Sequence, residues 1–530
     1  RRGRCPARAR TALAIVLIAF ALVGPWARPS AAHASLLETT PANDELVDRA
    51  PTEVRLRFDE GVDTFEGSIR VFDSGGERVD QGQVRQLEGG AVVVAAVDAR
   101  RQGTYTVAWR VVGSDGHDRS GSFVFHLGTR TGAADIDDGT DPIVGVLDYL
   151  ARWSALAGGL VMVGAAVLAT VTRDATARAR LRALVAAAGA AGSVAVAVLL
   201  VTQAASATGR SLGGALALTW DLATGTRTGK LTLVRLVALA AGAVVAWPGR
   251  VWRRAPWAPA LAGVAAFGAT SASGHAWIAE RRALAVAADV AHLGATAVWI
   301  GGLVALAVVL GLVEDRRGLV KRFSATALAA TAVVAASGTV SGYEQVGSLG
   351  ALTGTGYGRL LLAKVAGFAG LVWLGWVNRR RLLPAFDRAA TALARNVRVE
   401  LGIAAAVLAV TAVLIGQAPA RVSYSQPFAA TESTADLTVQ INVSPARTGA
   451  NLIHLYFFDA AGLAAEQVDA VEVSASTGSI PPRRLAVTPV TPSHVSLYDA
   501  ALTAPGTWRL EVTVVRAGTP TTVTFEVPIR

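Results

Sequence analysis

The sequence predicts a multidomain α+β membrane protein in which an eight-span transmembrane helical bundle lies between two β-sandwich domains. Apolar residues make up 52% of the 530 residues and charged residues only 17%, a balance typical of membrane proteins. Eight apolar segments between residues 143 and 416 are long enough to cross a bilayer. Short runs that alternate apolar and polar residues precede and follow them, as expected for strands with one buried face.

The N-terminal segment, residues 1–32, has the features of a secretory signal peptide. Arginines dominate its start, residues 11–23 form an apolar core, and small residues precede a cleavage site after Ala32. Cleavage there would make His33 the N-terminal residue, whose α-amine and imidazole are two nitrogen donors for a transition metal. Cleavage after Ala34 would instead remove His33, so this donor pair depends on processing.

Residues 33–128 are expected to form the first β domain. Strand-like runs such as 54–58 and 104–109 are separated by turn-forming residues, an arrangement that predicts a small sandwich or barrel. Residues 129–142, rich in Gly, Thr and Asp, are expected to be a linker. The same alternation returns near the C-terminus, as in 437–443.

The remaining boundaries follow from these patterns. The membrane domain is expected over 143–416, a second linker over 417–433, and a second β-sandwich over 434–530. The eight expected spans are 143–170, 183–207, 231–247, 257–277, 284–311, 323–343, 359–377 and 397–416.

The distribution of basic residues predicts the orientation of the bundle. If the first β domain is extracytoplasmic, the expected cytoplasmic loops carry 17 Lys and Arg and the expected outer loops carry 6. This bias fits the rule that cytoplasmic loops are enriched in basic residues. An even number of spans then places both β domains outside the cytoplasmic membrane.

Composition also limits the chemistry. The net charge of +11 comes largely from these loops, so it indicates membrane topology and no nucleic-acid partner. The single cysteine, Cys5, lies in the expected signal peptide, which excludes a disulfide or thiolate site from the processed chain. The single methionine, Met162, excludes a methionine-rich Cu(I) site.

One further motif offers metal ligands. Asp115 and His117 are separated by Gly116, so on an extended chain their side chains point the same way. Together with the amine and imidazole of His33 they would supply three nitrogens and one oxygen, a set that suits the tetragonal geometry of Cu(II).

The first β domain resembles the CopC copper-binding domain in the runs 33–43, 54–58 and 114–123, which occur in that order. The resemblance covers the whole domain and implies a cupredoxin-like or immunoglobulin-like β-sandwich. It also implies one Cu(II) per CopC-like domain, held by His33, Asp115 and His117. Some CopC proteins have a methionine-rich Cu(I) site, which this domain lacks because it contains no methionine.

The membrane segment resembles the CopD family. The run 292–302, which reads HLGATAVWIGG, is similar to the histidine-to-tryptophan signature of these proteins, as are the runs 322–324, 337–338, 357–364 and 378–379. The resemblance implies a polytopic copper-handling protein that moves copper toward the cytoplasm.

Two histidines lie in the outer half of this segment. His275 ends the fourth expected span and His292 lies about two turns into the fifth, so we expect them to meet in a transmembrane copper pathway. The alternative is that His275 is an interfacial residue and only His292 is buried.

Several other polar residues are interpreted as structural. His126 is expected to face solvent from a strand, and His454 and His494 to be structural residues of the C-terminal domain, which resembles small YtkA-like domains. Lys364 is expected to snorkel to the membrane interface and Glu400 to pair with an arginine.

The sequence therefore predicts a non-enzymatic, copper-binding integral membrane protein of copper resistance or homeostasis. Its partners would be copper ions and the lipid bilayer. The outer domain would capture Cu(II), and the bundle would pass copper inward. Two alternatives remain open: a haem-binding membrane electron carrier that uses His275 and His292 as axial ligands, and a copper-dependent oxidative enzyme built on the N-terminal histidine.

Overall fold

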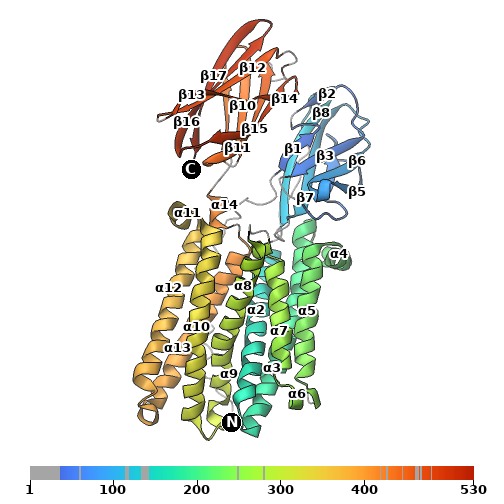
Figure 1. Cartoon of the computed structure of the whole chain (residues 1–530). Helices are drawn as coiled ribbons and strands as arrows, with labels where there is room; N and C mark the ends of the chain where they lie inside the picture. The colour runs from blue at the N-terminus through green and yellow to red at the C-terminus, as the bar shows by residue number, and fades with distance from the viewer. Residues whose placement is uncertain are drawn as a thin grey trace.

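Two β domains lie at one end of a bundle of helices (Figure 1). The computed structural model describes residues 36–529 with gaps at 44, 59–60, 114–117, 133–141, 248–249, 278–280, 418, 425–427, 445, 460–464, 466–467 and 479. The expected signal peptide and three predicted copper ligands, His33, Asp115 and His117, lie outside the described residues.

The N-terminal β domain consists of two four-stranded sheets, ordered β1-β3-β6-β5 and β2-β8-β7-β4. Its strands are β1 (Leu36–Thr40), β2 (Leu46–Val47), β3 (Glu53–Phe58), β4 (Ile69–Phe72), β5 (Asp80–Leu87), β6 (Val92–Val97), β7 (Gly103–Val112) and β8 (Asp118–Leu127). In β3, Val54, Leu56 and Phe58 enter the core while the charged residues between them stay exposed or half-buried. Strict alternation therefore decides which face of the sheet is buried.

The C-terminal β domain also has two sheets, a five-stranded one ordered β14-β15-β11-β10-β9 and a four-stranded one ordered β13-β12-β16-β17. Its strands are β9 (Phe428–Ser433), β10 (Leu437–Ser444), β11 (Gly449–Asp459), β12 (Ala470–Thr477), β13 (Ile480–Leu485), β14 (Thr488–Thr491), β15 (His494–Leu502), β16 (Gly506–Arg516) and β17 (Thr519–Ile529). Trp508 is fully buried between the sheets. Strand β9 lies within the stretch 417–433 that the sequence suggested as a linker.

Among the described residues, the bundle contains seven helical segments that are long and apolar enough to cross a membrane. These are α2 (Pro142–Val171), α3 (Ala175–Thr208), α5 (Arg227–Val245), the continuous segment Arg282–Leu312, α10 (Arg316–Val346), the continuous segment Gly356–Leu382, and α13 (Phe386–Ile415). The segment Arg282–Leu312 comprises α8 (Arg282–Thr296), the π-helix η4 (Ala297–Gly301), α9 (Gly302–Val309) and η5 (Leu310–Leu312). The segment Gly356–Leu382 comprises α12 (Gly356–Val377) and the π-helix η6 (Asn378–Leu382).

The fourth expected span is shorter than the others. Residues 257–277 form α7 (Ala258–Ala272), an apolar helix of 15 residues, followed by the 3₁₀ turn η3 (His275–Trp277). Figure 1 nevertheless shows α7 running alongside α5 and α2, so the chain crosses the bundle an even number of times and both β domains lie at one end. The basic loops 171–182, 312–322 and 378–398 lie at the opposite end (Figure 1).

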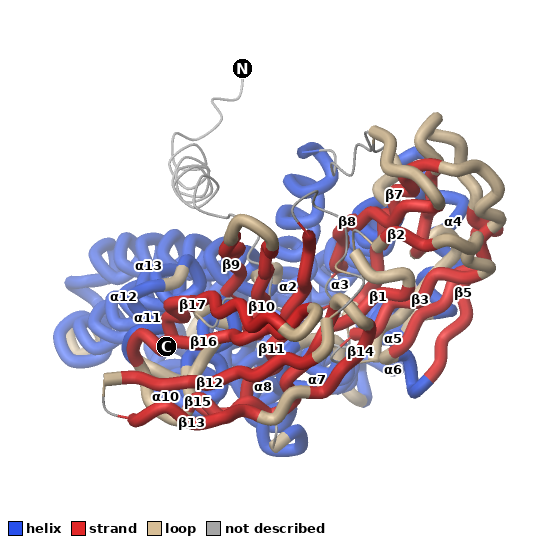
Figure 2. The backbone as a smooth tube through the Cα atoms, turned by 90° about the horizontal axis from the view of Figure 1, so that it is seen from above, coloured by secondary structure: helices blue, strands red, loops and turns tan. Residues whose placement is uncertain are grey.

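Short helices cover the ends of the bundle: α4 (Leu212–Gly225), α6 (Arg250–Arg254), α11 (Leu349–Gly354) and α14 (Ala420–Ser423). Viewed from above, the strands of both β domains lie over the helices (Figure 2). The N-terminal domain contacts the bundle through Asp63, whose Oδ2 accepts a hydrogen bond of 2.9 Å from the backbone N–H of Arg227 at the start of α5. Arg110 adds a hydrogen bond to the carbonyl oxygen of Ser206 in α3.

Candidate functional site

A cavity of about 1580 Å³ extends from the two β domains into the half of the bundle nearest to them. Its upper wall includes Leu36 and Arg119 of the N-terminal domain and Arg447 of the C-terminal domain. Its lower walls come from α2, α5, α7, α8, α10, α12 and α13. The cavity therefore connects both β domains with polar side chains inside the bundle.

The mouth of the cavity is formed by residues that directly flank the predicted copper ligands. Leu36 is three residues after His33, and Arg119 is two residues after His117. Ser120 and Trp109, which are neighbours in the β7–β8 pair, complete this edge. The ligands themselves lie outside the described residues, so the cavity is related to them only through these neighbours in sequence.

A charged cluster lies further inside. Asp289 of α8 and Lys364 of α12 both line the cavity, and Lys364 is within electrostatic range of Asp289 and of His292. Tyr357, also on α12, lies close to Asp289 and donates a hydrogen bond to Oε1 of Gln345. Ionisable residues are costly in a membrane, and these are arranged around a cavity and not against lipid.

His292 has a defined hydrogen bond that favours one tautomer. Its Nδ1 lies 3.1 Å from the Ser337 hydroxyl oxygen, and that hydroxyl donates to the Val333 carbonyl oxygen at 2.6 Å. A serine hydroxyl has one proton, and its 2.6 Å contact with the Val333 carbonyl oxygen is the shortest of its contacts, so this arrangement favours a proton on Nδ1 of His292 that is donated to Ser337. Nε2 therefore keeps the lone pair that can bind a metal ion.

The lower end of the cavity is apolar. Trp299 and Phe368 pack edge-to-face with ring centroids 5.9 Å apart, and Trp299 joins a cluster with Val334, Leu371 and Ala404. All five residues line the cavity. Glu400 lies one turn of α13 before Ala404 of this cluster, in the direction of the basic loop 378–398 along the chain.

Glu400 belongs to a separate polar network. Its Oε1 accepts a hydrogen bond of 3.1 Å from Nδ2 of Asn378, whose Oδ1 accepts one of 2.9 Å from Nδ2 of Asn396. The expected arginine partner is replaced by an amide. The π-helical turn that begins at Asn378 positions this amide beneath the apolar cluster.

Of the predicted transmembrane pair, His292 lines the cavity, whereas of His275 only the backbone is described, as the start of η3 between the cavity residues Gly274 and Ala276. The meeting of the two imidazoles therefore stays a prediction. Sequence reasoning missed Asp289, although a carboxylate one helical turn before His292 in an expected span was a usable signal.

Two other interpretations need correction. Lys364 does not snorkel to the interface, because it lines the cavity beside Asp289. His126 does not face solvent, because it is buried and its Nδ1 is 2.9 Å from the Thr104 hydroxyl oxygen. Met162, by contrast, is a packing residue, since it is fully buried in the core of the bundle.

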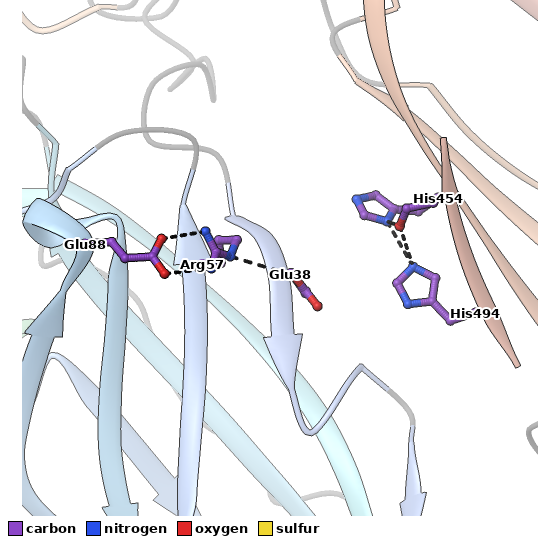
Figure 3. A network of polar contacts seen from close by, with 6 residues as sticks. Glu38, Arg57, Glu88, His454 and His494 are labelled. Atoms are coloured by element: carbon purple, nitrogen blue, oxygen red, sulfur yellow. Dashed lines mark hydrogen bonds and ion pairs between the residues drawn. The ribbon is translucent and has the colours of Figure 1, made fainter. Parts of the chain in front are cut away.

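The C-terminal domain contains a histidine pair that the sequence did not reveal. His454 of β11 and His494 of β15 lie on neighbouring strands, with His454 Nδ1 3.0 Å from His494 Nε2. Figure 3 shows both rings projecting from the C-terminal sheet toward the N-terminal domain. There Arg57 bridges Glu88, at 2.8 Å, and Glu38, at 3.8 Å.

Comparison with known families accounts for most of the chain. Residues 36–128 match the CopC domain, residues 143–283 the N-terminal domain of copper resistance protein D-like proteins, and residues 317–414 copper resistance protein D. Protein YobA of Escherichia coli (strain K12) is 32% identical over 22% of this chain and 93% of its own length. The chain belongs to the CopC–CopD copper-resistance family.

Other members of this family resemble longer parts of the chain. Copper transport protein CutJ of Bacillus subtilis (strain 168) is 24% identical over 84% of this chain and 85% of its own length. Copper resistance protein D of Pseudomonas syringae pv. tomato is 32% identical over 36% of this chain and 68% of its own length. The solved structure of CopC from Methylosinus trichosporium OB3b is 28% identical and covers 19% of this chain and all of its own, with a TM-score of 0.17.

Proposed function

We propose that this CopC–CopD protein captures Cu(II) outside the cytoplasmic membrane and passes copper inward through the cavity of its bundle. The N-terminal domain would hold one Cu(II) through His33, Asp115 and His117. Its relatives are named copper transport and copper resistance proteins, which supports transport over catalysis.

The observation that carries the proposal is the continuity of the cavity. Residues beside the predicted Cu(II) ligands form its mouth, and His292 with Asp289 lies within it. An ion released by the N-terminal domain therefore enters a space that offers an imidazole nitrogen and a carboxylate, both of which are copper ligands.

The charges in the cavity suit a transient stop for a cation. Asp289 and His292 are three residues apart on α8, so they share one face of the helix. In the absence of an ion, the ammonium group of Lys364 offsets the charge of Asp289. An entering cation would offset the charge of Asp289 in place of Lys364. Because it competes with Lys364 for the carboxylate, the cation is bound weakly enough to move on.

The orientation rests on the basic loops. They lie at the end opposite the β domains, and cytoplasmic loops are enriched in Lys and Arg. Passage to that side requires the apolar cluster around Trp299 to open toward Glu400, which lies beyond it.

Replacement of His292 by Ala tests the proposal. In cells that depend on this protein for copper uptake, we expect cellular copper to fall at least about tenfold, the range seen when a metal site loses a supporting group. The matched control is Thr339→Ala, which also removes a side chain from the cavity wall but whose hydroxyl bonds only to its own helix. Uptake unchanged in His292→Ala, at equal protein level, would exclude this pathway.

The outer site has its own test. N-terminal sequencing of the protein isolated from membranes should begin at His33, and Cu(II) titration should show one ion that is lost in His117→Ala. The control His126→Gln changes a buried histidine of the same domain that is bonded to Thr104. A chain that begins after Ala34 and still binds this Cu(II) would refute the proposed ligand set.

A further inference from the structure

The outer face of the five-stranded sheet of the C-terminal domain carries an unusual set of polar residues. In β11, Ile453, Leu455 and Phe457 enter the core, which places His454 and Tyr456 on the opposite face. The register pairs His454 with Ser496 and Tyr456 with His494. The fold thus brings together two histidines that are 40 residues apart in the chain.

The two imidazoles meet end to end. The nitrogens are 3.0 Å apart and the ring centroids are 5.2 Å apart. The two nitrogens therefore lie nearly on the line that joins the two ring centroids. The Ser496 hydroxyl oxygen lies 2.9 Å from His454 Nδ1 and 3.3 Å from His494 Nε2. Two nitrogen donors therefore point at one position, with a hydroxyl beside it.

The pair is built into the protein and is not a chance surface contact. His454 and His494 are only 8% and 4% exposed, and the ring of Tyr456 stacks on His494 with centroids 4.3 Å apart. The other nitrogen of His454, Nε2, is buried without a hydrogen-bond partner among the described residues. A buried polar atom left unpaired is costly, and such costs are typical of functional sites.

We propose that His454 and His494 form a second copper site, which binds Cu(I) as a two-coordinate ion between His454 Nδ1 and His494 Nε2. The inference rests on the proposed copper handling only for the choice of metal, and it does not depend on passage through the bundle.

The geometry favours a monovalent ion. Two collinear nitrogens suit the linear coordination of a d¹⁰ ion, and metal–nitrogen bonds of about 2.0 Å require the nitrogens to separate by roughly 1 Å. A divalent ion would need more ligands and negative charge. Among the described residues the site adds the Ser496 hydroxyl, and the carboxylate that interacts with the neighbouring Tyr456, that of Glu38, belongs to the other β domain.

The position of the pair fits copper exchange with the N-terminal domain. Both rings project toward that domain, and Glu38 of β1 and Tyr456 of β11 are within electrostatic range (Figure 3). Strand β1 begins at Leu36, three residues after the predicted ligand His33.

The histidine content of the chain makes a clean experiment feasible. There are seven histidines: His33, His117, His126, His275, His292, His454 and His494. In the full-length protein in lipid nanodiscs, four replacements by Ala (His33, His117, His275 and His292) leave the proposed site and His126. Cu(I) is then titrated without oxygen against a chromophoric Cu(I) chelator.

We expect this quadruple variant to bind one Cu(I) per chain, with an X-ray absorption spectrum of two nitrogens in linear coordination. Adding His454→Gln should abolish binding, whereas the matched control His126→Gln should preserve it. The X-ray absorption spectrum is recorded on the quadruple variant itself. It therefore tests the site even if the added His454→Gln substitution prevents folding.

Three results would overturn the proposal: no bound Cu(I) in the quadruple variant, equal binding after His454→Gln, or tighter binding of Zn(II) or Cu(II) than of Cu(I). Each is independent of the copper-uptake assay of His292→Ala, so failure of one proposal does not entail failure of the other.

Discussion

At the scale of single residues, one hydrogen bond decides which nitrogen of His292 is available. The Ser337 hydroxyl donates its proton to the Val333 carbonyl oxygen and therefore accepts a hydrogen bond from Nδ1. Ser337 is therefore a positioning residue: it fixes the ring and directs the metal-binding capacity to Nε2. The Nδ1 of His126 is also bonded to a hydroxyl, but His126 lies in a packed β domain and not beside a cavity.

Removal of this hydroxyl should weaken copper binding in the cavity without unfolding the bundle. For Ser337→Ala we expect about a tenfold loss of copper affinity at His292, because the ring loses its anchor. Ser337→Thr, which restores a hydroxyl, should recover most of it. The effect is measured by copper titration of protein in which the other proposed copper-binding histidines, His33, His117, His454 and His494, are replaced. Equal affinity in Ser337→Ala and wild type would show that the hydrogen bond does not position the ring.

The histidine pair of the C-terminal domain should make its stability sensitive to acid. The unfolded chain takes up a proton at His494 near pH 6.5, but the folded domain does so only near its pKa of about 4. Stability is therefore full above pH 6.5 and falls as the pH drops toward 4, by on the order of 3 kcal/mol.

Hydrogen exchange of β11 and β15, corrected for the intrinsic rate, measures this loss. His494→Gln should flatten the pH dependence, because its side chain does not titrate. An identical pH dependence in the variant and the wild type would contradict the assignment.

At the scale of elements, the bundle is held together where glycines let backbones meet. A Cβ on Gly164 of α2 would lie 2.3 Å from the backbone at Gly301 and Gly302, and one on Gly301 would lie 2.0 Å from the Leu160 carbonyl oxygen. This contact places the π-helix η4 against α2. Close crossings of this kind replace the hydrophobic effect as the source of helix association in membranes.

Gly164→Ala should therefore destabilise the bundle. Backbone atoms cannot move aside as a flexible side chain can, so we expect a cost of at least about 1–3 kcal/mol, seen as a lower thermal unfolding midpoint in detergent. The control is Gly294→Ala in α8, where a Cβ meets nothing within 4 Å. Equal midpoints for the two variants would refute the proposed crossing.

At the scale of the whole molecule, function depends on the N-terminal domain being held over the cavity. Asp63 accepts from the first backbone N–H of α5, where the helix dipole favours a negative charge. Arg110 adds a bond to the end of α3. These contacts hold Leu36 and Arg119 at the cavity mouth.

Asp63→Ala should loosen this attachment while leaving the domain folded. We expect faster hydrogen exchange in the first turn of α5 and a broader distribution of spin-label distances between the domain and the bundle. Asp98→Ala is the matched control, because its carboxylate pairs only with exposed Arg100 in the same domain. A distance distribution as narrow as that of the wild type would show that Asp63 does not tether the domain.

The orientation of the protein can be checked with single cysteines. Since Cys5 is the one cysteine of the sequence, Arg178→Cys and Thr434→Cys each give a unique label site in a chain processed at Ala32. In intact cells, an impermeant thiol reagent should label the site at 434 and spare the site at 178. The reverse pattern would place the β domains inside the cell.

The sequence by itself determined the order of the parts. Strand alternation depends on a period of two residues and span length on bilayer thickness, and both are local properties that a single chain displays directly. The CopC-like and CopD-like motifs and His292 were identified for the same reason, since each is contiguous in sequence.

Only the tertiary structure decided which distant side chains meet. Asp289 of α8 and Lys364 of α12 meet because both helices line one cavity, and His454 and His494 meet through the register of β11 with β15. No local pattern encodes such pairings, because they depend on the position of one element against another. That is why the sequence assigned Lys364 to the lipid interface and left the histidine pair unrecognised.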